Sequence, residues 1–326
     1  MSALPPNIHP LTVVSTFAGC GGSSLGYKLA GCNVLAAVEW DDHAARCYRL
    51  NHPTTRIFQG DIAKVSGAAI LDAIGLAVGD LDVLDGSPPC QGFSTAGRRQ
   101  LDDPRNGLFR EQLRLIDEMR PRNVVIENVS GMVKGKMRAV AAEILRSLQD
   151  RGYQIAAGVL NASYFGVAQS RERVFFVGSR IGKPSLPAPR THPVSCRQAL
   201  ADVEPDEILI PTKTAANERL LCRHLQRGSN GAEMLGRLGR KPNWFSSAML
   251  DPSLPSPTLM KRSRGKATLF HWHRRHLSIR EALVLQGFPP DYQLPGTFEQ
   301  RWARIGNSVC PPVTKAIAQE LAKLYG

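Results

Sequence analysis

One cysteine stands in a setting that suits nucleophilic chemistry. It is Cys90, within the sequence DGSPPCQGFS at 85–94. The apolar run at 81–84 predicts a short buried strand, which the following glycine and serine break. The two prolines after them fix their φ angles and donate no backbone N–H, so the chain leaves the strand along a stiff, extended path. Cys90 is therefore expected at the C-terminal end of a strand, where open α/β sheets bind their ligands.

The usual alternative for a single cysteine is a small buried hydrophobe. Two consecutive prolines and a polar, glycine-rich exit are poor core material, and they argue against that alternative here. Gly92 and Gly97 follow the thiol, with Arg98 and Arg99 behind them. The composition predicts a basic loop attached to a rigidly held thiol.

Two further groups of side chains have types and positions suited to chemistry. The run 123–129 predicts a buried strand that ends in Glu127 and Asn128, beside the strand that leads to Cys90. The turn at 166–173 carries Arg171 and Arg173, which alternate where the next strand begins, so both could point into one cleft. The alternative for this turn is an exposed basic loop.

The elements that must position these groups begin with a glycine-rich turn. The run 11–17 predicts a first strand, followed by the turn AGCGGSSLG at 18–26 and a short helix that ends near Gly31. Such a turn lets a nucleotide-containing cofactor approach the backbone at a helix N-terminus, although it is often only a structural turn. The strict G-x-G-x-x-G pattern of dinucleotide binding fails because Ser24 stands where the third glycine belongs, which disfavours a nicotinamide cofactor.

Acidic residues follow the next two predicted strands. Glu39 ends the strand predicted at 34–39, about 20 residues past the glycines, where a carboxylate can accept hydrogen bonds from ribose hydroxyls. The alternative is a surface acid at a strand end. Trp40 could stack on an adenine, although core tryptophans are more common. Asp61 follows another short strand and, from its neighbours alone, is a helix N-cap.

The remaining pattern predicts more helices and strands and a change of composition. Helices are predicted at 41–50, 108–119, 137–148 and 313–324, and strands at 154–160 and 174–178. Four prolines between 184 and 193 mark a linker, and the chain is then basic and weakly periodic to about Phe270, which predicts a smaller second domain.

The sequence SIRE at 278–281 is a capping box for a helix that continues to Gln286. The run HWHRRH at 271–276 lacks Cys or carboxylate neighbours at ligand spacing, so phosphate contacts are expected there rather than a metal site.

Composition sets the class of protein and partner. The chain has 326 residues, 43% of them hydrophobic, which suffices for one large domain and a smaller one. Its net charge of +13 favours a polyanionic partner, nucleic acid above all. Seven cysteines without regular spacing are typical of reduced thiols in a cytosolic protein. No signal peptide and no membrane-spanning stretch are expected.

The motifs together resemble those of the DNA cytosine C5-methyltransferases, in that family's ordinary, unpermuted order. The matching stretches run from Phe17 to Val309. They are FAGCGG at 17–22, Asp61 with its apolar neighbour, PPCQ at 88–91, ENV at 127–129, QSRER at 169–173, RE with QGFP between 280 and 289, and GNSV at 306–309.

The resemblance implies an α/β fold: a doubly wound, Rossmann-like sheet of the S-adenosylmethionine-dependent methyltransferases, with a second, smaller target-recognition domain. We expect a catalytic and cofactor-binding domain at 1–182, a target-recognition domain at 183–275 and a return segment at 276–326 that completes the catalytic domain. The implied enzyme is a DNA (cytosine-5-)-methyltransferase of the bacterial restriction-modification type. It is expected to methylate C5 of a cytosine flipped out of a specific double-stranded DNA sequence, leaving S-adenosyl-L-homocysteine.

The resemblance also assigns site residues. The catalytic residues are expected to be Cys90, Glu127, Arg171 and Arg173. The cofactor is expected to contact Phe17, Ala18, Gly19, Cys20, Gly21, Gly22, Ser24, Leu25, Glu39, Trp40, Asp61, Ile62, Pro88, Leu108, Asn307, Ser308 and Val309. DNA contacts are expected from Gln91, Ser94, Arg98, Arg99 and Thr258, with Trp244 and Phe245 as further candidates. No metal is expected.

The residues fit covalent catalysis. Cytosine C5 is a poor nucleophile until a thiolate adds at C6, and Cys90 is the candidate for that addition. A free thiol has a pKa of about 8.5, so positive charge such as that of Arg171 would help it ionise. Glu127 is expected to hold the N3 edge of the base. Arg173 either orders Glu127 or contacts a phosphate.

Three alternatives remain at this stage: a tRNA cytosine-5 methyltransferase, a catalytically silent DNA-binding member and a different cofactor enzyme such as a dehydrogenase. The Cys-Phe-Thr signature of the tRNA branch is not found in the recognition region. The presence of all four catalytic residues disfavours a silent member, and the missing third glycine disfavours a dehydrogenase. We further expect a monomer in the bacterial cytoplasm, at the nucleoid when acting, with no membrane partner. An accompanying restriction endonuclease would not be in contact with it.

Overall fold

A computed structural model describes residues 10–89, 107–207, 216–237, 239, 247–261 and 268–326. The chain divides into two compact units. Unit 1 comprises Met1–Leu160, Glu172–Ala188 and Val313–Gly326, and unit 2 comprises Asn161–Arg171 and Pro189–Pro312. Within the expected return segment, 276–312 therefore fall in unit 2 and only the last 14 residues fall in unit 1, so the three-part domain organisation stays a prediction.

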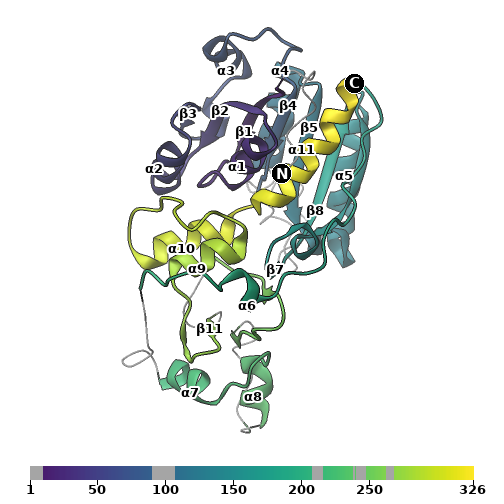
Figure 1. The fold of residues 1–326 in the computed structure, drawn as a ribbon. Helices are drawn as coiled ribbons and strands as arrows, with labels where there is room; N and C mark the ends of the chain where they lie inside the picture. Colours follow the sequence, from purple (N-terminus) through teal and green to yellow (C-terminus); the bar gives the residue numbers. More distant parts are fainter. Residues whose placement is uncertain (1–9, 90–106, 208–215, 238, 240–246, 262–267) are drawn as a thin grey trace. The chain divides into compact units, whose positions relative to one another are not determined.

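Unit 1 is built on a seven-stranded sheet with the order β3-β2-β1-β4-β5-β8-β6 (Figure 1). Its strands are β1 (Thr12–Thr16), β2 (Asn33–Glu39), β3 (Arg56–Gln59), β4 (Val83–Gly86), β5 (Asn123–Val129), β6 (Gln154–Asn161) and β8 (Glu172–Ser179). Neighbouring strands from β3 to β5 are parallel, and β8 runs antiparallel to β5. The carboxyl ends of β1, β2, β3, β4 and β5 therefore lie at one edge of the sheet, as the sequence predicts.

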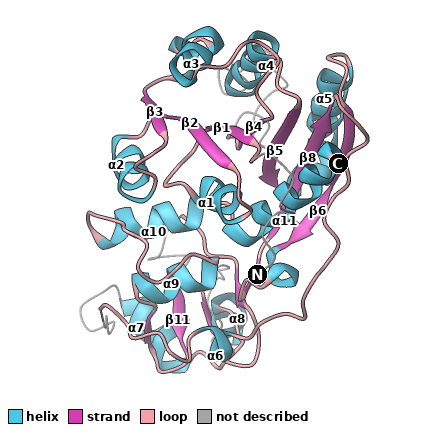
Figure 2. Cartoon of the chain, turned by 45° about the horizontal axis from the view of Figure 1, so that its top comes forward, coloured by secondary structure: helices cyan, strands magenta, loops and turns pink. Residues whose placement is uncertain are grey.

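Helices cover both faces of this sheet (Figure 2). They are α1 (Gly22–Leu29), α2 (Asp42–Asn51), α3 (Gly67–Ile74), α4 (Gly107–Met119), α5 (Arg138–Gln149) and α11 (Pro311–Ala322). Apolar side chains of α3, α4 and α5 form one core cluster with Val14, Leu84 and other strand residues. Successive strand side chains point to opposite faces, so Asp85, which accepts hydrogen bonds from Ser15 and from Ser23 of α1, lies on the other face. This doubly wound arrangement confirms the predicted fold class.

Short 3₁₀ helices join several of these elements. They are η1 (Ile62–Lys64), η3 (Ser130–Val133), η4 (Gly135–Met137), η5 (Ala162–Phe165) and η6 (Lys323–Tyr325).

Unit 2 has little regular structure, as its weak periodicity predicts. It contains β7 (Gln169–Ser170) paired with β10 (Ser256–Pro257), and a small sheet with the order β12-β11-β9. The strands of that sheet are β9 (Ala248–Met249), β11 (Leu269–His271) and β12 (Arg275–His276). The helices are α6 (Cys196–Ala199), α7 (Ala216–His224), α8 (Gly231–Arg237), α9 (Ile279–Gln286) and α10 (Phe298–Asn307).

Helix caps explain where α9 and α10 of unit 2 begin. Ser278 and Glu281 form the predicted capping box of α9, and Gly287 ends that helix with a φ of 88°. Helix α10 was not predicted from the sequence, although Thr297 and Gln300 form a second capping box at its start. No helix in the described part of the chain is long and apolar enough to cross a membrane.

Candidate active site

The glycine turn after β1 is held by a carboxylate from the next strand. Phe17, Gly19 and Gly21 all have positive φ angles, of 52°, 58° and 98°, and they bend the chain from β1 into α1. Glu39 accepts hydrogen bonds from the backbone N–H of Gly19 at 2.7 Å and of Asp41 at 2.8 Å. Burial raises the pKa of the Glu39 carboxyl, and these N–H donors oppose that rise. Glu39 therefore fixes the shape of the turn.

Two other predicted cofactor positions flank this turn at the same edge of the sheet. Trp40 follows Glu39 directly and leaves 75% of its surface exposed, so it is not a core tryptophan. Asp61 is the N-cap of η1, where it accepts a bond from the backbone of Ala63 at 3.1 Å, and Ile62 behind it is buried. The structure thus brings the residues predicted after β1, β2 and β3 to one edge.

The remaining predicted positions near the turn are mostly buried. Ser24 is fully buried and accepts a hydrogen bond from the Tyr48 hydroxyl at 2.8 Å. Leu108, at the start of α4, is partly buried against the core cluster. The other buried members of this set are Ala18, Cys20, Gly21, Gly22 and Pro88, and Leu25 is partly buried.

An acid that the sequence analysis did not assign lies beneath the turn. Asp85 of β4 is 4% exposed and accepts hydrogen bonds from Ser15 at 3.1 Å, Ser23 at 2.7 Å and Tyr27 at 3.3 Å. Burial raises its pKa to about 6, the three hydroxyl donors lower it, and the charge of Glu127 raises it further. Asp85 therefore ties β4, which leads toward Cys90, to the first turn of α1.

The end of β5 carries the predicted acid and amide. A carboxylate oxygen of Glu127 lies 3.1 Å from the Nε of Arg173, and both side chains are largely buried. Asn128 donates its amide to the backbone oxygen of Pro88 at 2.9 Å, two residues before Cys90. Of the two roles open for Arg173, this ion pair supports the ordering of Glu127. Cys90 itself, together with Gln91, Ser94, Arg98 and Arg99, lies outside the described residues, as do Trp244 and Phe245.

The two arginines of the turn at 166–173 are held by different parts of the chain. Arg173 pairs with Glu127 in unit 1, whereas Arg171 belongs to unit 2 and is 3% exposed. The guanidinium group of Arg171 donates to the backbone oxygens of Leu259, Gly306 and Ser308. A catalytic role for Arg171 stays a prediction.

The other predicted positions in unit 2 lie close to these carbonyl groups. Thr258 donates its hydroxyl to the backbone oxygen of Ser170 at 2.9 Å. Asn307 is the last residue of α10 and is exposed, while Ser308 and Val309 are 8% and 7% exposed.

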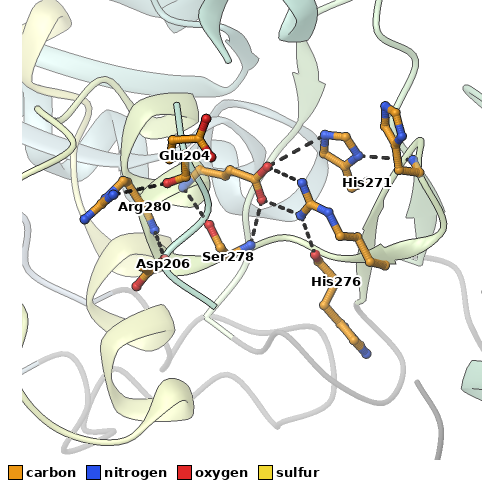
Figure 3. A network of polar contacts seen from close by, with 9 residues as sticks. Glu204, Asp206, His271, His276, Ser278 and Arg280 are labelled. Atoms are coloured by element: carbon orange, nitrogen blue, oxygen red, sulfur yellow. Dashed lines mark hydrogen bonds and ion pairs between the residues drawn. The ribbon is translucent and has the colours of Figure 1, made fainter. Parts of the chain in front are cut away.

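The run at 271–276 has a different role from the one expected. Arg275 forms a bidentate ion pair with Glu281, at 2.6 and 2.7 Å, and a ring nitrogen of His271 lies 3.7 Å from the same carboxylate (Figure 3). The expectation of phosphate contacts is wrong for these two side chains, because Glu281, which also caps α9, already binds them. Within the described residues, no group of three or more His, Cys, Asp or Glu side chains could hold a metal ion. All six cysteines there are buried, and none forms a disulfide bond.

Comparisons with known proteins agree with this geometry. A family model described as C-5 cytosine-specific DNA methylase matches residues 11–323. The Type II methyltransferase M1.HphI of Haemophilus parahaemolyticus is 30% identical over 96% of this chain and 87% of its own length. The Type II methyltransferase M.AquIA of Picosynechococcus is 42% identical over 52% of this chain and 73% of its own.

Solved structures resemble the whole described fold. A prophage-encoded protein of E. coli described as a DNA modification methyltransferase is 27% identical, with a TM-score of 0.72, and the match covers 96% of this chain and 99% of that one. The methyltransferase EhMeth of Entamoeba histolytica has a TM-score of 0.69 at 17% identity, over 96% and 98% of the two chains, and is similar in fold.

Proposed function

The chain belongs to the C-5 cytosine-specific DNA methylase family and is a DNA cytosine-5 methyltransferase; we propose that S-adenosylmethionine is its methyl donor and that Cys90 forms a covalent adduct with the target base. The observation that carries the proposal is the end of β5. There Glu127 is paired with Arg173, and Asn128 holds the backbone two residues before Cys90.

The residues around the glycine turn fit S-adenosylmethionine. A Cβ atom at Gly19 would meet no atom within 4 Å, so there is open space beside the turn. The carboxylate of Glu39 accepts from backbone N–H groups through both of its oxygens and keeps lone-pair capacity for a ribose hydroxyl. The exposed ring of Trp40 can stack on the adenine, with Asp61 and Ile62 beside it and the segment 307–309 as a further contact. When bound, the cofactor supplies an electrophilic methyl group to C5.

The chain's own residues make C5 reactive. The Cys90 thiolate forms a bond to C6, which pushes an electron pair through the ring and turns C5 into an enamine carbon. Glu127, in its protonated form, donates to N3 and neutralises the charge pushed onto the ring. Such acid catalysis typically contributes roughly 10² to 10⁴ in rate. After methylation, water takes the proton from C5 and β-elimination returns the electron pair to the Cys90 sulfur.

Arg173 and Asn128 act on the two reacting groups. The guanidinium group of Arg173 orients the Glu127 carboxyl through the 3.1 Å contact. Asn128 holds the carbonyl of Pro88 at the start of the Pro-Pro segment, which supports the proposal that this segment positions the thiol.

DNA recognition is proposed to use the basic charge and the residues near Thr258. The net charge of +13 suits binding to phosphates, and C5 and C6 of a stacked cytosine cannot be attacked until the base is flipped out. The Type II methyltransferases among its relatives support a role in a restriction-modification system of the bacterial cytoplasm. The same proposal includes a monomer that acts at the nucleoid without contact to its cognate endonuclease.

A labelled-methyl transfer assay tests the proposal. The protein is incubated with S-adenosylmethionine carrying an isotopic methyl label and either duplex DNA or tRNA. Label in the DNA as 5-methylcytosine, lost in Cys90→Ala, is the expected result. Label in tRNA alone would support the tRNA alternative, and tight DNA binding without label in any substrate would indicate a silent member.

A further inference from the structure

Arg171 joins three backbone segments of unit 2. Its guanidinium group is almost fully buried and donates to the backbone oxygens of Leu259 at 3.0 Å, Gly306 at 3.0 Å and Ser308 at 3.1 Å. Hydrogen bonds from an ionised donor are roughly twice as strong as neutral ones, and the planar guanidinium group fixes their directions. The segment around Leu259 and the segment 306–308 are therefore held at a set distance by one side chain.

Two buried glutamines connect the same segments a second time. Gln169 accepts from the backbone N–H of Leu259 at 3.0 Å and donates to the side chain of Gln286 at 2.7 Å. Gln286 in turn donates to the backbone oxygen of Ser308 at 2.7 Å. Both glutamines are fully buried, so each bond is strong and each lost bond is costly.

The two segments also touch directly. Trp302 of α10 donates its indole N–H to the backbone oxygen of Met260 at 2.9 Å. A Cβ atom at Gly306 would lie 2.5 Å or less from the carbonyl group of Met260, so only glycine permits this approach. A shift in either segment must therefore move the other.

We propose that Arg171 is a positioning residue that couples DNA binding to cofactor binding, by fixing the segment 258–260 against the segment 306–309. The inference rests on the proposed function, in which Thr258 contacts DNA and Asn307, Ser308 and Val309 contact the cofactor. The two terminal NH2 groups of Arg171 donate to backbone oxygens within unit 2, which supports this positioning role.

The test measures how DNA changes cofactor affinity. Calorimetry gives the Kd of S-adenosylhomocysteine for the full-length protein, alone and saturated with a duplex that carries its target sequence, found by bisulfite sequencing. The ratio of the two Kd values is the coupling factor, which in coupled proteins typically lies at roughly 5 to 150. Arg171→Lys keeps the charge but cannot reach three carbonyls, so the coupling factor of this variant is expected to fall to about 1–2. The Kd values of the variant for S-adenosylhomocysteine alone and for DNA alone are each expected to change less than about threefold.

Two further variants separate the possible outcomes. Gln286→Met removes one link to Ser308 while keeping the shape of the side chain, and it should reduce the coupling factor partly. Arg173→Lys disturbs Glu127 instead, and it should lower kcat with the coupling factor unchanged. Thermal unfolding of each variant verifies that it is folded.

The inference is overturned if Arg171→Lys keeps the coupling factor of the wild type. If Arg171→Lys lowers only kcat, the result supports the predicted catalytic role of Arg171 and contradicts the positioning role. A wild-type coupling factor of one would overturn it as well. If the wild type bound neither S-adenosylhomocysteine nor the duplex, the proposed function would be contradicted, and the inference that rests on it would be contradicted as well.

Discussion

Replacing Asp85 by asparagine should stabilise the protein at neutral and alkaline pH. Asp85 is buried beneath the glycine turn, and its pKa is raised from the usual 3.8 to about 6. The charges and donors that face it are Glu127 and the hydroxyl groups of Ser15, Ser23 and Tyr27. An acid whose pKa is higher in the folded protein holds its proton more tightly there, so its ionisation destabilises the fold.

The size of this effect follows from the pKa difference. The cost begins as the pH rises above the unfolded value of about 3.9 and is complete above the folded value. Two pKa units at about 1.36 kcal/mol each correspond to about 3 kcal/mol. Asparagine has the same shape and no charge: its oxygen can still accept from Ser15 and Ser23, and its amide can donate to the Tyr27 hydroxyl.

Urea unfolding of the wild type and Asp85→Asn between pH 4 and pH 8 measures this difference. The variant should gain up to about 3 kcal/mol over the wild type at pH 8 and little or nothing at pH 4. Asp72→Asn, at an exposed position on α3, is the control and should show a nearly constant difference between pH 5 and pH 8. An equal Asp85→Asn effect at pH 5 and pH 8 would refute the description of Asp85 as a buried, ionising carboxyl.

Three other predictions concern the cofactor, the DNA and the chemistry. Glu39→Ala removes the acceptor for two backbone N–H groups of the turn, so calorimetry should show cofactor affinity reduced at least tenfold. DNA binding without cofactor should stay nearly intact, and an unchanged cofactor affinity would contradict the assignment of Glu39 to the cofactor site. DNA affinity should fall steeply with salt, with a logarithmic slope near −0.9 per neutralised phosphate, and a flat dependence would mean that the basic charge serves another purpose. Glu127→Gln should lower kcat by roughly 10² to 10⁴ at unchanged cofactor affinity, and a fall in cofactor affinity alone would contradict its role as the acid.

Much of the fold could be predicted from the sequence, because local patterns determine it. The apolar runs that become β1, β2 and β5 lie between clear turn residues, and the capping box at Ser278 specifies where α9 begins. The helix α10 was not predicted, although Thr297 and Gln300 form the same kind of box at its start.

The roles of Asp85, Arg171 and Arg275 could not be predicted in the same way. The partners of Asp85 lie 58 to 70 residues earlier, so nothing near it indicates its burial. Arg171 binds backbone oxygens 88 to 137 residues away, and every residue has such an oxygen, so no pattern of side chains marks them. Arg275 pairs with a glutamate only six residues later whose capping role was predicted, but the basic run around Arg275 does not by itself mark which of its side chains makes that pair.

A suicide substrate tests the covalent mechanism most directly. The substrate is a target duplex whose cytosine carries fluorine at C5, incubated with the protein and S-adenosylmethionine. Cys90 should add to C6 and the methyl group should transfer, but β-elimination needs a proton at C5 and fluorine cannot leave in that way. We predict a protein–DNA complex that survives denaturation, requires the cofactor and maps to Cys90. Attachment to one of the buried cysteines Cys20, Cys47 or Cys310, or full activity in Cys90→Ala, would contradict the mechanism.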